Sequence, residues 1–168
     1  MYHPELLRVL DPRFVAEAAE QGLDELYRAR EVIHQVEGQL SFVRRLAQGR
    51  IDILCTELEC RALGGEPGDL GELIARLPEV FGAGQVAPST RSGTEVVMDP
   101  SYAEALDAVA GSNLLLVLPE YTSSELDEIV QLLEAFEQEI SGQRRGLHNA
   151  IDGVQIEIAR RYRSSAVG

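Results

Sequence analysis

Two stretches of the same helical periodicity constrain the fold of this 168-residue chain. In both stretches, apolar residues recur at spacings of three and four, which is typical of a helix with one buried stripe. From Leu23 to Ala62, the stripe comprises Leu26, Ala29, Ile33, Val36, Leu40, Val43, Ala47 and Leu54. From Ser123 to Tyr162, it comprises Leu126, Ile129, Leu133, Phe136, Ile140, Leu147 and Val154.

The equal register and similar length of the two stretches predict that they pack on each other as a coiled coil. Two ordinary amphipathic helices in a bundle are the alternative. A chain of this length fits a single domain with one core. We therefore expect an all-α fold, with a two-helix coiled coil, short accessory helices and a long connecting segment. That segment is long enough for parallel or antiparallel packing, so the sequence leaves the direction open.

Local signals predict where the helices begin and end. Gly64-Gly65 should end the first long helix, and Thr122 with Glu125 forms a T-x-x-E capping box before the second. Asp11-Pro12 is typical of an N-cap followed by the first residue of a helix, here reaching about Gln21. The expected segments are 1–22 with one short helix, 23–63, 64–121, 122–163, and a tail at 164–168.

The connecting segment has mixed character. Leu70–Leu77 and Tyr102–Val109 are predicted as short helices. Phe81–Pro100 is rich in Gly, Ser, Thr and Pro and is predicted as a loop. A loop of that length is usually functional or mobile, so it is a candidate for contact with the coiled coil or with a partner.

A polar pattern, E-x3-S-x2-R-x3-(Q/H)-x3-D, occurs once in each long helix, in the same register. The first copy comprises Glu37, Ser41, Arg44, Gln48 and Asp52, and the second Glu137, Ser141, Arg144, His148 and Asp152. The helices share further identical pairs, including Ile51/Ile151, Glu57/Glu157 and Arg61/Arg161. A repeated set of polar side chains with no role in an apolar core favours a ligand site.

The spacing of the pattern places its five side chains on one helical face, within an arc of about 80°. This polar face lies roughly 100° around the helix from the apolar stripe, so each copy should flank the contact between the helices. The two copies would then line one groove. Glycines at 38, 49, 142, 146 and 153 cost about 1 kcal/mol each relative to alanine in a helix, and close approach of a ligand or another backbone would explain them.

The residue types of the pattern suit a purine nucleotide, with guanine preferred. Arginine offers a planar pair of donors to guanine O6 and N7 or to phosphate. A carboxylate can accept from guanine N1–H and N2–H2, which cytosine and adenine cannot match. The alternative is that Glu37–Arg44 and Arg44–Gln48–Asp52 are surface pairs within one helix, worth a few tenths of a kcal/mol.

Composition excludes several classes of function. The net charge of −13 argues against direct binding to DNA, and it suits a basic protein partner or simply keeps the chain soluble.

Cys55 and Cys60 are five residues apart, which suits buried reduced thiols and a cytoplasmic protein. No signal peptide is apparent, and the longest apolar run, Leu114–Leu118, is too short for a membrane span. The sequence lacks a nucleophile–base pair, a metal-binding cluster and a phosphate-binding glycine loop, so neither an enzyme nor a metal site is expected.

The duplicated pattern resembles that of the RsiG family, the cyclic di-GMP-dependent anti-sigma factors of actinobacteria. The resemblance implies an antiparallel coiled coil that binds a dimer of cyclic di-GMP, with one copy of the pattern serving each ligand molecule. It also implies that the loaded protein holds a WhiG-type sigma factor away from RNA polymerase and so delays sporulation genes. The ligand residues it implies are Glu37, Ser41, Arg44, Gln48, Asp52, Glu137, Ser141, Arg144, His148 and Asp152.

Two features leave alternatives open. His148 departs from the family pattern, because imidazole cannot donate and accept together as an amide does, so binding at the second copy is expected to differ and to depend on pH. A coiled-coil adaptor that binds no ligand is the second hypothesis for the whole chain. Candidate partner-contacting positions, chosen for expected exposure, are Glu57, Glu59, Glu128 and Glu157.

Overall fold

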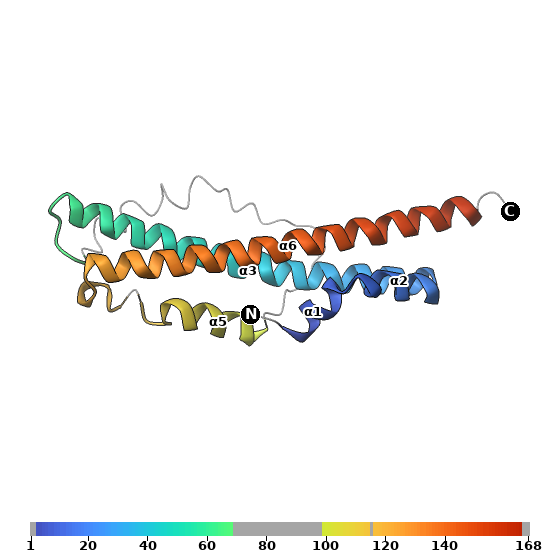
Figure 1. The fold of residues 1–168 in the computed structure, drawn as a ribbon, viewed down its shortest axis with the longest axis horizontal. Coiled ribbons are helices and arrows are strands. Elements are labelled where there is room, and N and C mark those ends of the chain that lie inside the picture. Colours follow the sequence, from blue (N-terminus) through green and yellow to red (C-terminus); the bar gives the residue numbers. More distant parts are fainter. Residues whose placement is uncertain (1–2, 69–98, 115, 166–168) are drawn as a thin grey trace. The chain divides into compact units, whose positions relative to one another are not determined.

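The computed structural model describes residues 3–68, 99–114 and 116–165, and every regular element in these ranges is helical. The elements are α1 (Pro4–Leu10), α2 (Pro12–Gln21), α3 (Leu23–Ala62), α5 (Pro100–Ala110), the 3-10 helix η1 (Leu118–Glu120) and α6 (Ser123–Ser165). The long helices α3 and α6 pack antiparallel (Figure 1). The all-α prediction is confirmed, and the direction that the sequence left open is antiparallel.

The chain divides into two compact units, and each contains part of both long helices. Unit 1 comprises Met1–Phe42, Val96–Tyr102 and Glu139–Gly168, and unit 2 comprises Val43–Glu95 and Ala103–Gln138. In unit 1, the Tyr27 and Tyr162 hydroxyls are 2.8 Å apart, near the start of α3 and the end of α6. In unit 2, Arg61 near the end of α3 donates to the carbonyl of Tyr121, just before α6 begins. Both contacts follow from the antiparallel direction.

The predicted apolar stripe of α3 forms its buried face, since all eight of its side chains are at most 3% exposed. On α6 the predicted stripe is only partly right, because Ile129 and Phe136 are half-buried. The buried positions of α6 are Leu126, Val130, Leu133, Ile140, Leu147, Ile151, Val154 and Ile158. They follow alternating spacings of four and three with two interruptions, which fall at Glu137 and Arg144. Two residues of the polar pattern therefore occupy positions of the helix contact itself, rather than flanking it.

The capping signals have the predicted geometry. Glu125 N donates to Thr122 Oγ1 at 3.3 Å, and Thr122 N donates to Glu125 Oε2 at 2.7 Å, which completes the capping box. At the end of α3, Gly64 N bonds Arg61 O and Gly65 N bonds Cys60 O. This is a Schellman motif, and it requires the φ of +85° that Gly64 adopts.

The N-terminal segment contains two short helices where one was predicted. α2 begins at Pro12 as expected, with Asp11 Oδ1 accepting from Arg13 N at 2.9 Å. α1 precedes it, and the Nδ1 atom of His3 accepts from Glu5 N at 3.3 Å to cap that helix. The expectation of a single helix was wrong, because histidine is not among the usual N-cap residues and α1, at seven residues, is too short to show a clear periodicity.

The accessory helices pack on the long helices within their units. In unit 1, Leu6, Val9, Phe14 and Ala18 of α1 and α2 are buried. In unit 2, Arg50 of α3 donates to Asp107 Oδ1 at 2.6 Å and to the carbonyl of Leu106, which anchors α5.

The connecting segment was predicted only in part. The predicted helix at Tyr102–Val109 corresponds to α5, which begins earlier because Asp99 caps it by accepting from Ser101 N at 2.9 Å. Pro100, expected to end the loop, is therefore the first residue of α5. The predicted helix at Leu70–Leu77 and the loop from Phe81 to 98 lie outside the described residues.

Candidate site: two polar clusters between the long helices

The first polar cluster lies in unit 1 and forms around the carboxylate of Glu37 on α3. Ser41 Oγ donates to Glu37 Oε1 at 2.7 Å, and Arg144 of α6 donates to the same oxygen from Nε at 3.0 Å and Nη2 at 2.8 Å. His148 Nε2 is 3.6 Å from this oxygen. We call Glu37, Ser41, Arg144 and His148 the Glu37 cluster. All four are residues of the predicted site, and they come from both copies of the pattern.

The environment of Glu37 favours its charged form. Burial by itself raises the pKa of this carboxyl, but the hydrogen bonds from Ser41 and Arg144 and the charge of Arg144 outweigh burial, so the pKa is lowered. The side chains of Glu37 and Arg144 are 18% and 21% exposed, so solvent screens the pair only in part. No donor of the described residues reaches Oε2 of Glu37, which leaves one carboxylate oxygen that can accept from a ligand.

The second polar cluster lies in unit 2 and forms around Glu137 of α6. Arg44 Nη1 donates to Glu137 Oε1 at 3.1 Å, and Gln48 Nε2 donates to the same oxygen at 3.4 Å. We call these three residues the Arg44 cluster. Arg44 Nε is buried without a partner in the part of the chain that the structure describes. An unsatisfied buried donor is costly, so this atom is a point at which a bound acceptor would stabilise the site.

In both clusters the glutamate comes from one copy of the pattern and the arginine that it binds comes from the other. Glu37 accepts from Arg144 and lies near His148, and Glu137 accepts from Arg44 and Gln48. The antiparallel direction causes this exchange, because it sets the first residues of one copy beside the central residues of the other. The alternative of pairs within one helix, Glu37–Arg44 and Arg44–Gln48–Asp52, is therefore not what the structure contains.

A cleft of about 570 Å³ adjoins the Arg44 cluster. Its lining comes from α3 and α6 and comprises Gln48, Ile51, Asp52, Glu134, Glu137 and Gln138. Gln48, Asp52 and Glu137 belong to the predicted site, whereas Ile51, Glu134 and Gln138 were not predicted. The sequence did contain a signal for Ile51, because the second long helix has an identical residue, Ile151, at the equivalent position. Glu134 and Gln138 have unlike repeat partners, His34 and Gly38, so comparison of the copies could not find them.

The remaining predicted residues lie at the surface. Asp52 and Asp152 are both exposed, and within the described ranges neither carboxylate has a hydrogen bond or ion pair. Ser141 is half-buried. A shallow depression of about 530 Å³ adjoins Asp152, and its lining, Asp152, Gln155, Ile156 and Ala159, comes from α6 alone. The carboxylates that were expected to recognise guanine are thus open to a ligand from solvent.

A second duplicated element, E-x3-R, follows the polar pattern in each helix. Glu57 is 1% exposed and its Oε1 accepts from Arg61 Nε at 2.6 Å and Gly68 N at 2.8 Å. Arg61 also donates to the carbonyls of Leu118 and Tyr121. The expectation that Glu57 is an exposed partner-contacting position was therefore wrong. Its carboxylate is enclosed by the Arg61 side chain and by the backbone that follows α3 at Gly68.

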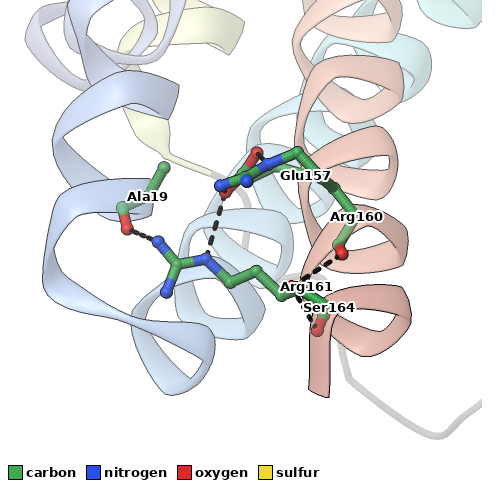
Figure 2. Close-up of polar contacts among 5 residues, drawn as sticks. All are labelled: Ala19, Glu157, Arg160, Arg161 and Ser164. Carbon is green, nitrogen blue, oxygen red and sulfur yellow. Dashed lines mark hydrogen bonds and ion pairs between the residues drawn. The ribbon is translucent and has the colours of Figure 1, made fainter. Parts of the chain in front are cut away.

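The repeat partner of this element has the same local pairing at the other end of the hairpin. Glu157 accepts from Arg160 and from Arg161 Nε at 3.0 Å, and Arg161 also donates to the carbonyl of Ala19 in α2 (Figure 2). The hydrogen bonds from Arg160 and Arg161 lower the pKa of Glu157 to about 2. Each copy of the element therefore holds the backbone of an accessory segment against its long helix.

The glycines of α6 have more than one explanation. A Cβ added at Gly146 would lie 2.7 Å from Leu10 Cδ2, so this glycine makes room for α1 rather than for a ligand. Gly153 faces Val15 of α2, where an added Cβ would make an ordinary contact at 3.8 Å. At Gly142 the nearest atom is Arg145 Nη2, also at 3.8 Å. Of the two alternatives predicted for these glycines, a ligand or a neighbouring segment of the chain, the structure has the neighbouring segment at Gly146.

In the described ranges, no group of three or more His, Cys, Asp or Glu side chains is arranged to hold a metal ion. Cys55 and Cys60 form no disulfide within the described residues, and both are half-buried rather than buried as predicted; burial raises the pKa of the Cys55 thiol. Among the helices of the described residues, none combines the length and the apolar character that crossing a membrane requires.

These features define a class of protein: an antiparallel helical hairpin with two polar clusters, each built from both copies of a duplicated pattern. Residues 12–81 match the model of the RsiG-like family. The match covers α2, α3 and the first copy of the pattern, and it confirms the resemblance over these residues. No curated protein matches the chain.

Proposed function

We propose that this protein is a cyclic di-GMP-binding anti-sigma factor that, when loaded, sequesters a WhiG-type sigma factor and represses its sporulation genes. The observation that carries the proposal is the exchange of partners between the two copies of the pattern. It gives each unit a cluster with an arginine and a glutamate, and in unit 2 the exposed Asp52 lines a cleft together with Glu137 and Gln48 of that cluster. The RsiG-like match over residues 12–81 supports the same function.

The residues of each cluster offer complementary chemistry to a guanine nucleotide. Arg44 and Arg144 supply planar donors for phosphate or for guanine O6 and N7. Asp52 and Asp152 supply exposed carboxylates that can accept from N1–H and N2–H2. The ligand must compete with Glu137 and Glu37, which hold the arginines in the free protein. Ligand binding would then alter the packing of α3 on α6, because these ion pairs connect the two helices.

Calorimetric titration with cyclic di-GMP tests the ligand. We expect binding in the micromolar range or tighter and at least a tenfold loss for Arg44→Ala and for Arg144→Ala, at unchanged helicity. Arg28→Ala is the matched control, because Arg28 is largely exposed and, among the described residues, forms its ion pair with Glu25 of its own helix. No heat of binding for the wild-type protein at tens of micromolar would contradict the proposal.

Measurement of partner affinity with and without cyclic di-GMP tests the regulation. We expect the purified sigma factor to bind the loaded protein and to bind the free protein at least tenfold more weakly. Glu59 and Glu128 are exposed acidic side chains that suit basic surfaces of the partner. Equal affinity in both states would contradict ligand gating while leaving ligand binding intact.

A ligand-free adaptor is the second candidate, and one observation favours it: Glu37 and Glu137 already neutralise both arginines. Under this hypothesis the clusters only stabilise the hairpin. Arg44→Ala would then lower the free energy of unfolding, and cyclic di-GMP would not raise the melting temperature of any variant.

A further inference from the structure

The cleft beside the Arg44 cluster is rich in hydrogen-bond acceptors. Three of its six lining residues, Asp52, Glu134 and Glu137, carry carboxylates, and Gln48 and Gln138 carry amides. Gln48 donates its amide N–H to Glu137, so its carbonyl oxygen can also accept. Arg44, the cation of this cluster, is held by Glu137. The charge inside the cleft is therefore net negative.

A negative cleft excludes phosphate and selects a group that donates. The Watson–Crick edge of guanine has two adjacent donors, N1–H and N2–H2, which a carboxylate can accept together. Adenine has an unprotonated N1 at the corresponding position, and a carboxylate repels it. The apolar side chain of Ile51 adds a surface against which the face of a base can pack.

We infer that Glu134 joins Asp52 in recognising a guanine base in this cleft, and that the phosphates of the ligand lie outside it. This inference rests on the proposed function, since it assigns the base subsite of the same ligand. Asp52 of α3 accepts from N1–H and one hydrogen of N2, and Glu134 of α6 accepts from the other hydrogen of N2, so both helices contribute a carboxylate to the base. Gln138 completes the lining with an amide that can donate to guanine O6.

The subsite belongs to the Arg44 cluster and is not repeated by sequence in the other copy. The residues one hundred positions before Glu134 and Gln138 are His34 and Gly38, which bring neither a carboxylate nor an amide. The two ligand-binding regions therefore differ in how strictly they select guanine. The two copies already differ at Gln48 and His148, and they differ more in chemistry at Glu134 and Gln138.

Comparison of cyclic di-GMP with cyclic di-inosine monophosphate tests the inference, because inosine lacks only the 2-amino group of guanine. We expect Glu134→Gln to weaken binding of cyclic di-GMP about tenfold and to change binding of the inosine analogue little, so that selectivity falls. Gln138→Ala should weaken both ligands equally, because both bases carry O6. Glu31→Gln, at an exposed glutamate of α3 outside the cleft, should leave both affinities unchanged.

Three outcomes would contradict the guanine subsite or the function on which it rests. Unchanged selectivity in Glu134→Gln, with wild-type helicity by circular dichroism, would overturn the role of Glu134. Tighter binding of both ligands by this variant would show that a phosphate lies near residue 134, and it would overturn the guanine assignment. If the wild-type protein binds neither ligand, the proposed function itself fails, which distinguishes that failure from failure of the inference alone.

Discussion

Arg144 donates from both Nε and Nη2 to one carboxylate oxygen of Glu37, at 3.0 and 2.8 Å, although the two residues lie in different helices and 107 positions apart. Glu137 and Arg44 form the reciprocal pair. Each arginine is thus held by the glutamate of the other copy. The pairs connect α3 to α6 through residues of the duplicated pattern.

Double-mutant cycles should detect the exchange of partners. We expect Arg144→Ala and Glu37→Gln to be coupled by about 1 kcal/mol in the free energy of unfolding, because the two side chains are bonded and partly buried. The control cycle combines Glu37→Gln with Arg44→Ala, which belong to the same copy. A coupling as large in the control as in the exchanged pair would mean that the pairing is wrong.

Acid should weaken the contribution of Glu37 to stability. Its pKa is lowered from the ordinary value of 4.5, so the folded state is favoured above about pH 4.5, and this advantage is lost as the pH falls through the lowered value. We expect Glu37→Gln to cost about 1 kcal/mol at pH 7 and progressively less below pH 4.5, because there the carboxyl of the unfolded wild-type chain takes up a proton before that of the folded protein does. Urea unfolding at pH 7 and pH 3.5 provides the measurement. A constant difference between the two proteins would contradict the ion pair.

The two copies of the E-x3-R element should differ in their effect on stability. Glu57→Gln removes the charge that a 10% exposed Arg61 faces, and breaking such a buried pair costs about 3–5 kcal/mol. Glu157→Gln is the matched control, with a smaller expected cost because Arg160 is 63% exposed and water can replace its partner. Thermal unfolding of both variants compares them directly. Similar melting temperatures would show that Glu57 is not buried as described.

Alanine at two glycines of α6 should distinguish open space from packing. Gly142→Ala should stabilise the protein by about 1 kcal/mol, because alanine is the better helix former and the site has room. Gly146→Ala should stabilise the protein by less, because Leu10 must move away from the new methyl group. Denaturant midpoints measure both. A larger gain at Gly146 than at Gly142 would contradict the packing of α1 at this position.

Much of the helical framework was predictable because its causes are local. Capping by Thr122 and Glu125 and the glycine end of α3 depend on residues within one turn. The stripe of α3 follows from its own periodicity. The stripe of α6 was predicted less well because the two repeats were assumed to bury equivalent faces. In the structure, Glu137 and Arg144 occupy positions of the helix contact that the sequence pattern assigned to its flank.

The sequence by itself selected the side chains that form the two polar clusters, because a pattern repeated in register selects them without knowledge of any contact. Only the tertiary structure decided which glutamate meets which arginine, that Glu57 is buried, and that Glu134 joins Asp52 in one cleft. The physical reason is that periodicity defines the faces of one helix but not the direction or axial position of its neighbour. Those depend on packing between residues that lie far apart along the chain.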